Sequence, residues 1–374
     1  MSTVASPTSI PRYPDQGFSA KVARLGANER SKRNRLVRRD DHDYSQRLRL
    51  GFQLAFLALN VWIAVQFYLW VRWAENGGPG IAVPRPAGVE GWLPIEGLMQ
   101  LKYVLASRRL PLIHPAGFFL FLAFLLIAWL LRKSFCAWLC PVGTVSEYLW
   151  KLGRFIFRRN FPLPRWVDSP LRALKYILLT FFVYAVAEMS AASIAEFVSS
   201  PYGLVVDVRM LNFFRNLGGT AAYVILGLLI ASLLVQNFWC RYLCPYGALM
   251  GLVALFSPAR IVRLESACID CAKCAKACPA LLPVDRLLQI RSAECTSCLE
   301  CIAVCPAKDA LALSVSTAMM PPKKRTPVWA FAATIALLFV VIVGYARVRG
   351  HWETHLPTQV YLHYVPAANE QQHP

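Results

Sequence analysis

Long apolar stretches alternate with polar, basic segments along this chain, and five of the stretches are long enough to cross a membrane as helices. A hydrocarbon core of about 30 Å needs about 20 helical residues at about 1.5 Å each. The five stretches are Leu50–Val71, Leu112–Leu131, Tyr176–Phe197, Leu217–Cys240 and Thr326–Ala346. The third contains Glu188 and Glu196, whereas the other four contain no Asp, Glu, Lys or Arg. The pattern therefore predicts five transmembrane helices.

The composition agrees with this interpretation, since 56% of the residues are hydrophobic and the mean hydropathy is +0.42. The net charge of +19 would by itself suggest nucleic acid, but its distribution indicates a topology signal instead. With five spans, the segments on the N-terminal side of the membrane carry 31 Lys and Arg residues, and the opposite segments carry nine. The positive-inside rule then places the N-terminus in the cytoplasm and the C-terminus on the opposite side, which for a bacterial inner membrane is the periplasm. Membrane lipid is the expected partner of the basic arm, and nucleic acid is not expected.

Two segments of the chain repeat each other in sequence. The heptapeptide LLIAWLL (Leu125–Leu131) matches LLIASLL (Leu228–Leu234). Each heptapeptide is followed by a Cys-x3-Cys-Pro motif, in SFCAWLCPVG and in FWCRYLCPYG. The repeat predicts two helices of the same direction, each of which ends in a cysteine pair at the cytoplasmic face.

The strongest chemical signal is a pair of Cys-x2-Cys-x2-Cys-x3-Cys-Pro motifs, CIDCAKCAKACP and CTSCLECIAVCP. This is the ligand spacing of bacterial two-cluster ferredoxins, in which the fourth cysteine of each motif ligates the other cluster. Zinc sites normally use two separated Cys-x2-Cys units, and disulfides are disfavoured in the cytoplasm. The motifs therefore predict two [4Fe–4S] clusters, the first held by Cys268, Cys271, Cys274 and Cys305, and the second by Cys295, Cys298, Cys301 and Cys278.

These patterns divide the chain into five predicted parts. They are a basic cytoplasmic tail (1–49), a four-span membrane domain with both Cys-x3-Cys-Pro motifs (50–260), a cytoplasmic ferredoxin domain (261–318), a fifth transmembrane helix (326–346) and a periplasmic tail (347–374). The predicted fold class is an α-helical membrane protein with an internal repeat and a small α+β ferredoxin domain of the two-cluster bacterial type.

The order of these motifs resembles the membrane polyferredoxin family of the NapH, NosR and CcoG type. The resemblance covers most of residues 50–315 and rests on two span-plus-Cys-x3-Cys-Pro units followed by eight ferredoxin cysteines. It implies electron transfer between the quinone pool or a cytoplasmic donor and a respiratory or periplasmic redox partner. It also implies an electron-transfer component, not a stand-alone enzyme. The motif order does not distinguish the subfamilies.

The four remaining cysteines, Cys136, Cys140, Cys240 and Cys244, leave three interpretations open. Residues i and i+4 of a helix share one face, so two such pairs offer four thiolates to a further iron–sulfur cluster or another fixed metal centre. The pairs also suit redox-active thiols or a transient copper(I) site, since soft thiolates favour that ion. A structural role is the third interpretation. The interpretation as redox-active thiols or a copper(I) site supports an alternative function, a reductase or assembly factor that handles copper or thiols during maturation of a metalloenzyme.

Two titratable residues stand out in the predicted spans. Glu188 is an ionisable group in an apolar stretch, which suggests a proton acceptor for quinol or a carboxylate in a polar crevice. His114 begins the second stretch, and a lone histidine in this place is more often a structural hydrogen-bonding residue. The sequence does not decide the role of either.

Overall fold

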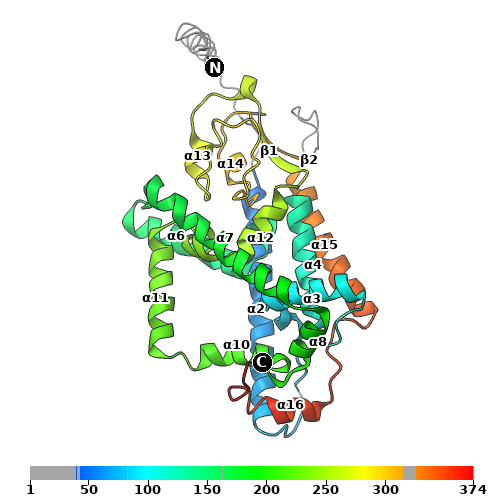
Figure 1. The fold of residues 1–374 in the computed structure, drawn as a ribbon. Coiled ribbons are helices and arrows are strands. Elements are labelled where there is room, and N and C mark those ends of the chain that lie inside the picture. The colour runs from blue at the N-terminus through cyan, green and yellow to red at the C-terminus, as the bar shows by residue number, and fades with distance from the viewer. Residues whose placement is uncertain (1–38, 40–42, 82, 162, 316–325, 374) are drawn as a thin grey trace, which may run out of the picture.

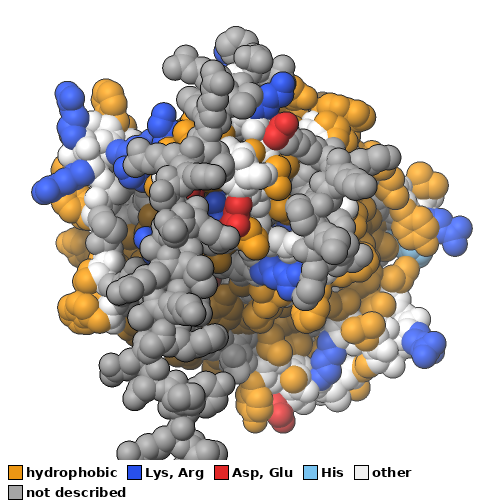
Figure 2. Space-filling view, turned by 90° about the horizontal axis from the view of Figure 1, so that it is seen from above, with side chains coloured by type: hydrophobic (Ala, Val, Ile, Leu, Met, Phe, Trp, Pro, Cys, Tyr) orange, Lys and Arg blue, Asp and Glu red, His pale blue; other side chains and the backbone are white. Residues whose placement is uncertain are grey.

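The computed structural model describes residues 39, 43–81, 83–161, 163–315 and 326–373, and it shows a mostly helical molecule (Figure 1). The small ferredoxin elements lie at one end, and the last helix and the C-terminus lie at the opposite end. The long helix α2 runs between the two ends. Seen from the ferredoxin end, Lys and Arg side chains lie around the rim, with hydrophobic side chains between them (Figure 2). The predicted basic tail falls largely outside the described residues.

The helices and strands follow one another in this order: α2 (Ser45–Glu75), η1 (Ala87–Trp92), α3 (Pro94–Ser107), α4 (Pro115–Leu131), α5 (Ser134–Trp138), α6 (Pro141–Phe157), α7 (Arg165–Glu188), α8 (Ala191–Ser199), α9 (Pro201–Leu204), α10 (Val206–Arg215), α11 (Gly219–Leu234), η2 (Trp239–Leu243), α12 (Pro245–Ala254), β1 (Ala259–Arg263), η3 (Glu265–Ala267), α13 (Lys273–Ala277), α14 (Glu300–Ala303), β2 (Leu311–Val315), α15 (Val328–Val348) and α16 (Thr358–Tyr364).

Three helices in the described part of the chain are long and apolar enough to cross a membrane, namely α2, α7 and α15. The pair α10 and α11 passes the same test together but is bent by 83°. The second predicted span forms α4, which has 17 residues and is shorter than a usual span. The structure thus agrees with a membrane protein, and the count of five spans stays a prediction.

The third predicted span is broken where the sequence pattern continues. Helix α7 ends at Glu188, and α8 begins two residues after Met189. Ser190 explains the break, because its hydroxyl accepts a hydrogen bond from the Ser193 N–H and so caps a new helix. The prediction of one continuous helix over 176–197 is therefore wrong.

Helix α4 lies at the centre of the membrane part. It begins at Pro115, which has no N–H to donate and suits the first turn of a helix. Its side chains are apolar on every face, as expected of a helix surrounded by protein. It packs against α15, α3 and α12, and most of its residues are buried.

The ferredoxin unit is small and has an antiparallel two-stranded sheet at its base. Strands β1 and β2 pair from Ala259 with Val315 to Arg263 with Leu311. The cysteine loops and the short helices α13 and α14 lie between the two strands in the sequence. The sheet therefore closes the ends of the cysteine-bearing segment onto each other, next to the end of α12.

Candidate iron–sulfur centres

The eight cysteines of the ferredoxin segment lie in two groups of four. One small cavity is lined by Cys268, Cys271, Cys274 and Cys305. A second is lined by Cys278, Cys295, Cys298 and Cys301. Each group takes three cysteines from one motif and one from the other, which is the grouping that the spacing predicts. Their role as cluster ligands stays a prediction.

The backbone turns in the same way around the second cysteine of each motif. Asp270 and Ala272, which flank Cys271, have φ values of 52° and 55°. Ser297 and Leu299, on either side of Cys298, have φ values of 49° and 62°. Residues other than glycine rarely adopt this left-handed conformation, and strain of this kind concentrates at functional sites. The repeated turns direct successive cysteines towards one cavity.

Burial disfavours the thiolate form of several of these cysteines. Burial raises the pKa of the Cys274 thiol to about 11. It also raises the pKa of the Cys298 thiol to about 12, against the opposing effect of the Arg49 guanidinium. Because ligand thiols must lose their protons, cationic iron has to displace protons here, and binding is coupled to pH.

The two Cys-x3-Cys-Pro pairs do not lie on single helix faces, so that prediction is wrong. Cys136 belongs to α5, but Cys140 is extended and precedes α6 as its N-cap. In the second motif, Cys240 lies in η2 and Cys244 is the extended N-cap of α12. The proline after each second cysteine explains the break, because it disfavours helical backbone in the residue before it. Each pair therefore straddles the junction of two helices.

Both second cysteines point their sulfur at the start of the helix that follows. The Gly143 N–H donates to Cys140 Sγ at 3.4 Å, and the Gly247 N–H donates to Cys244 Sγ at 3.2 Å. Burial raises the pKa of the Cys140 thiol well above its ordinary value, and the Gly143 N–H at the positive end of the helix opposes that rise. The two motifs thus share a local geometry suited to holding negative sulfur.

All four sulfur-bearing residues of these motifs line one cavity of about 750 Å³. Lys133 and Tyr246 also line it. The Lys133 Nζ and Cys244 Sγ atoms lie 3.6 Å and 3.5 Å from the position that a Cβ on Gly247 would take. The buried ammonium therefore adds positive charge beside the thiols. The four thiols are suitable ligands for an iron–sulfur cluster. The two helix N-termini and the Lys133 ammonium would offset the negative charge of such a thiolate-bound cluster.

Buried ion pairs join this site to the ferredoxin unit. Lys175 donates to both oxygens of Glu294, at 2.6 and 2.7 Å, and Glu294 directly precedes Cys295. On the other side, Arg49 donates to both oxygens of Glu147 at 2.8 and 2.7 Å. The same guanidinium pairs with Glu300 at 2.9 Å, next to Cys301.

The sequence analysis did not identify these ionic residues. Glu294 and Glu300 each stand directly before a cysteine of the second motif, which was an available signal. Arg49 and Lys175 lie far from the cysteines in sequence and carried no signal. Their positions depend on how α2 and α7 pack.

The large cavity continues away from the cysteines between α2, α4 and α15. Phe135, next to Cys136, stacks on Phe124 with ring centroids 4.0 Å apart. Phe124 and Leu120 both line the cavity and lie one helical turn apart. At the end opposite the ferredoxin unit the lining includes Arg85 and Trp352. Cys298 of the ferredoxin unit is also part of the lining.

The remaining candidates occupy different surroundings. Glu188 is exposed at the end of α7 and does not line the large cavity. His114 is buried, and its Nδ1 atom lies 2.7 Å from Glu96 Oε1. Among the described residues, no three His, Cys, Asp or Glu side chains lie close enough together to hold a single metal ion.

Fold and site together define a class: helical membrane proteins with a ferredoxin unit built on cysteine loops. The 4Fe-4S binding domain family matches residues 113–164 and 217–263, and the 4Fe-4S dicluster domain family matches residues 260–313. The chain is 46% identical to the putative electron transport protein YccM of Escherichia coli over 325 residues, which cover 86% of this chain and 90% of that protein.

More distant relatives include the regulatory protein NosR of Pseudomonas aeruginosa, 34% identical over 39% of this chain and 20% of its own length. The ferredoxin-type protein NapH of Escherichia coli is 26% identical over 46% of this chain and 59% of its own. No solved structure matches. The chain belongs to the membrane polyferredoxin family of the NapH and NosR type.

Proposed function

We propose that this protein passes single electrons along a row of three iron–sulfur centres at the cytoplasmic face of the bacterial inner membrane. Two [4Fe–4S] clusters would be held by the two ferredoxin groups of cysteines. A third centre would be held by Cys136, Cys140, Cys240 and Cys244. When bound, such clusters supply one-electron oxidation and reduction. The observation that carries the proposal is the cavity that Cys298 shares with these four cysteines.

The residues around the third site support its use as a relay. Arg49 and Glu300 tie the ferredoxin unit to α6, which follows Cys140. Lys175 and Glu294 make a second tie from α7 to the loop before Cys295. Two ties on separate helices hold the cysteine groups at constant separation, as repeated electron transfer requires. Lys133 offsets the negative charge of four thiolates in a site of low dielectric constant.

The apolar part of the cavity supports hydroquinone in the membrane as one redox partner, in place of or beside a cytoplasmic donor. Aromatic and aliphatic side chains dominate its lining, as in most sites for apolar cofactors. The stacked rings of Phe124 and Phe135 lie between this region and Cys136. The other partner would be a respiratory or periplasmic redox protein. The excess of Lys and Arg on one side supports a cytoplasmic ferredoxin unit and N-terminus.

Iron and sulfide analysis with EPR spectroscopy of the anaerobically purified protein tests the proposal. Three cubane clusters contain about twelve iron atoms and two contain about eight. We expect about twelve in the native protein and about eight in the Cys140→Ser/Cys244→Ser variant, with the ferredoxin EPR signals retained. About eight irons in both proteins would exclude the third cluster. Reversible binding of copper(I) by the native protein alone would instead support the reductase or assembly alternative.

A further inference from the structure

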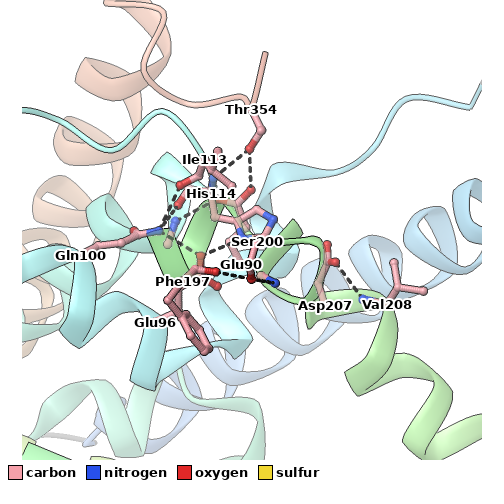
Figure 3. Close-up of polar contacts among 12 residues, drawn as sticks. Glu90, Glu96, Gln100, Ile113, His114, Phe197, Ser200, Asp207, Val208 and Thr354 are labelled. Carbon is pink, nitrogen blue, oxygen red and sulfur yellow. Dashed lines mark hydrogen bonds and ion pairs between the residues drawn. The ribbon is translucent and has the colours of Figure 1, made fainter. Parts of the chain in front are cut away.

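Figure 3 shows a buried polar cluster that includes Asp207 of α10, a helix at the end of the molecule opposite the ferredoxin unit (Figure 1). Arg85 donates to Glu90 at 2.8 Å and to Asp207 at 2.8 Å. His114 pairs with Glu96 at 2.7 Å. The remaining contacts tie these pairs together: Thr354 bridges the His114 N–H and Glu90, and Gln100 donates to Glu96. Residues 85–100, His114, Asp207 and residues 354–361 supply the cluster and the Tyr361 ring beside it.

The charges of this cluster do not balance. Burial lowers the pKa of His114, but the Glu96 carboxylate outweighs this effect and raises the pKa to about 9. The imidazole is therefore cationic at neutral pH, and with Arg85 it gives two positive charges against three carboxylates. Burial raises the pKa of Glu90, although Arg85 and His114 oppose the shift. A buried set with one surplus negative charge favours uptake of one proton.

Several polar atoms of the cluster have no hydrogen-bond partner among the residues that the structure describes. They are His114 Nε2, Glu96 Oε2, Gln100 Oε1 and Tyr361 Oη, and all are buried. Buried polar atoms are normally paired, and a group of donors and acceptors of this kind suits ordered water. Water between them would connect the carboxylates and the imidazole as a path for protons.

One wall of the large cavity is formed by residues that belong to the cluster or stand next to its members in the sequence. Arg85 belongs to both, since it lines the cavity and pairs with Glu90. In η1, Gly91 lines the cavity, while its neighbour Glu90 is buried on the cluster side. Along the tail, Glu353 lines the cavity and the next residue, Thr354, contacts Glu90.

The wall is also close to the aromatic path towards the cysteines. A Cβ on Gly91 would lie 3.0 Å from Leu120 Cδ1. Leu120 is one turn of α4 from Phe124, which stacks on Phe135 beside Cys136. A ring bound between Gly91 and Phe124 would therefore have the acidic cluster on one side and the path to the thiols on the other.

We propose that this cluster is the proton acceptor for a hydroquinone bound in the cavity, an inference that rests on the proposed function. Oxidation of one hydroquinone to quinone releases two protons and two electrons. The electrons leave singly to oxidised iron–sulfur centres. Each proton passes, by way of Glu353 and Thr354, to Glu90, and the cluster releases it to water at the end opposite the ferredoxin unit before it takes the next.

The test is anaerobic single-turnover reduction of the cluster-loaded protein in nanodiscs by a short-chain ubiquinol or menaquinol. The loss of iron–sulfur absorbance measures the rate of reduction, which is determined over a range of pH. Glu90→Gln is the test variant. Glu75→Gln is the matched control, because Glu75 forms an ion pair with Arg215 at the same end but outside the cavity. Reduction by dithionite and EPR measure cluster content in every variant.

We expect the native rate to fall as the pH falls, since the acceptor must be deprotonated. Glu90→Gln should lower the rate about 10²-fold and remove this pH dependence, as loss of a general base does. Glu75→Gln should match the native protein, and dithionite should reduce every variant fully. Asp207→Asn, which also removes the surplus charge, should slow the reaction about tenfold; it serves as the test if Glu90→Gln does not fold.

Two results would overturn the inference, and they are distinguishable. A native rate and pH profile in Glu90→Gln would show that the cluster is only structural, while electron transfer from quinol would stand. If quinol fails to reduce the native protein although dithionite does, both the inference and the choice of hydroquinone as donor are wrong. The iron count would still decide the rest of the proposed function independently.

Discussion

The two Cys-x3-Cys-Pro units have almost the same sequence but opposite surroundings. In the first, the heptapeptide LLIAWLL lies in α4 at the centre of the protein, and Ile127 is completely buried. In the second, LLIASLL lies in α11, which stands apart from the bundle in Figure 1, and Ile230 is 48% exposed. Of the residues of α11, all of which the structure describes, Ser232 alone is buried. An apolar helix face is thus compatible with either a protein core or lipid, because lipid tails are as apolar as leucine.

The one difference between the heptapeptides falls where the packing differs. Trp129 is 49% exposed on α4, whereas Ser232 at the same place in α11 is 4% exposed. Beside Ser232, the Leu233 carbonyl of α11 lies against Gly153 of α6, where any Cβ would clash with it. Small residues let two helix backbones approach this closely. The second unit is therefore held by a tight crossing with α6, whereas most residues of the first are buried among neighbouring helices and Trp129 is left exposed.

The two units also contact the ferredoxin unit differently at matching positions. Glu147, seven residues after Cys140, binds Arg49, which in turn binds Glu300. Gly251, seven residues after Cys244, allows direct approach, since a Cβ there would lie 2.8 Å from the Ala293 carbonyl oxygen. One unit uses charge and the other uses close packing to hold the same cysteine loops.

The largest expected difference comes from truncating the matched isoleucines. Ile127→Ala removes atoms from a closed core, and we expect a loss of about 2–5 kcal/mol in the free energy of unfolding. Ile230→Ala on the exposed face should change it by about 0.5 kcal/mol or less. Thermal unfolding in the same detergent measures both. Equal losses would mean that α11 is also enclosed by protein, by a second chain or a partner.

The matched glycines of the cysteine motifs should differ less. A Cβ on Gly143 would lie 2.2 Å from the Cys136 carbonyl oxygen, whereas on Gly247 its nearest neighbour is the Cys244 sulfur at 3.5 Å. We expect Gly143→Ala to cost about 1–3 kcal/mol by overpacking and to lower the iron content. Gly247→Ala should retain both stability and iron. Iron analysis that ranks the two variants in the reverse order would contradict this geometry.

The smallest expected effect is a change in the pH dependence of the free energy of unfolding. Burial raises the pKa of Glu147, but the Arg49 and Lys151 charges outweigh it and hold the pKa below its ordinary value of 4.5. A depressed pKa means that this stabilisation is present above pH 4.5 and is lost as the pH falls through the folded-state pKa. Glu147→Gln should therefore cost about 1 kcal/mol at neutral pH and less in acid.

The control for this prediction uses the second unit. Unfolding midpoints of Glu147→Gln and of Gly251→Ala should be measured at neutral and at acid pH. The close contact at Gly251 involves no titrating group, so the cost of Gly251→Ala should not depend on pH. A cost of Glu147→Gln that stays constant into acid would show that the Arg49 pair does not stabilise the fold.

The features that could be predicted from sequence are local ones. The grouping of Cys305 with Cys268 followed from motif spacing, because each cysteine loop is one short turn of chain. Helices α2 and α15 followed from uniform apolar runs of sufficient length. The prediction failed at α7, where Ser190 caps a new helix inside an apolar run, and at the cysteine pairs, where the preceding apolar pattern hid the effect of Pro141 and Pro245.

By itself, the sequence determined the kind of protein this is: an apolar, membrane-embedded chain whose cysteine spacing is specific to iron–sulfur ligation. Only the tertiary structure decided which of two near-identical helices became the core, that both cysteine pairs line one cavity, and that His114 joins Arg85 and Glu90 in a buried acidic cluster. The reason is physical. Spacing and hydropathy act along the chain, whereas burial and charge pairing arise between segments that are distant in sequence and leave no periodic pattern in it.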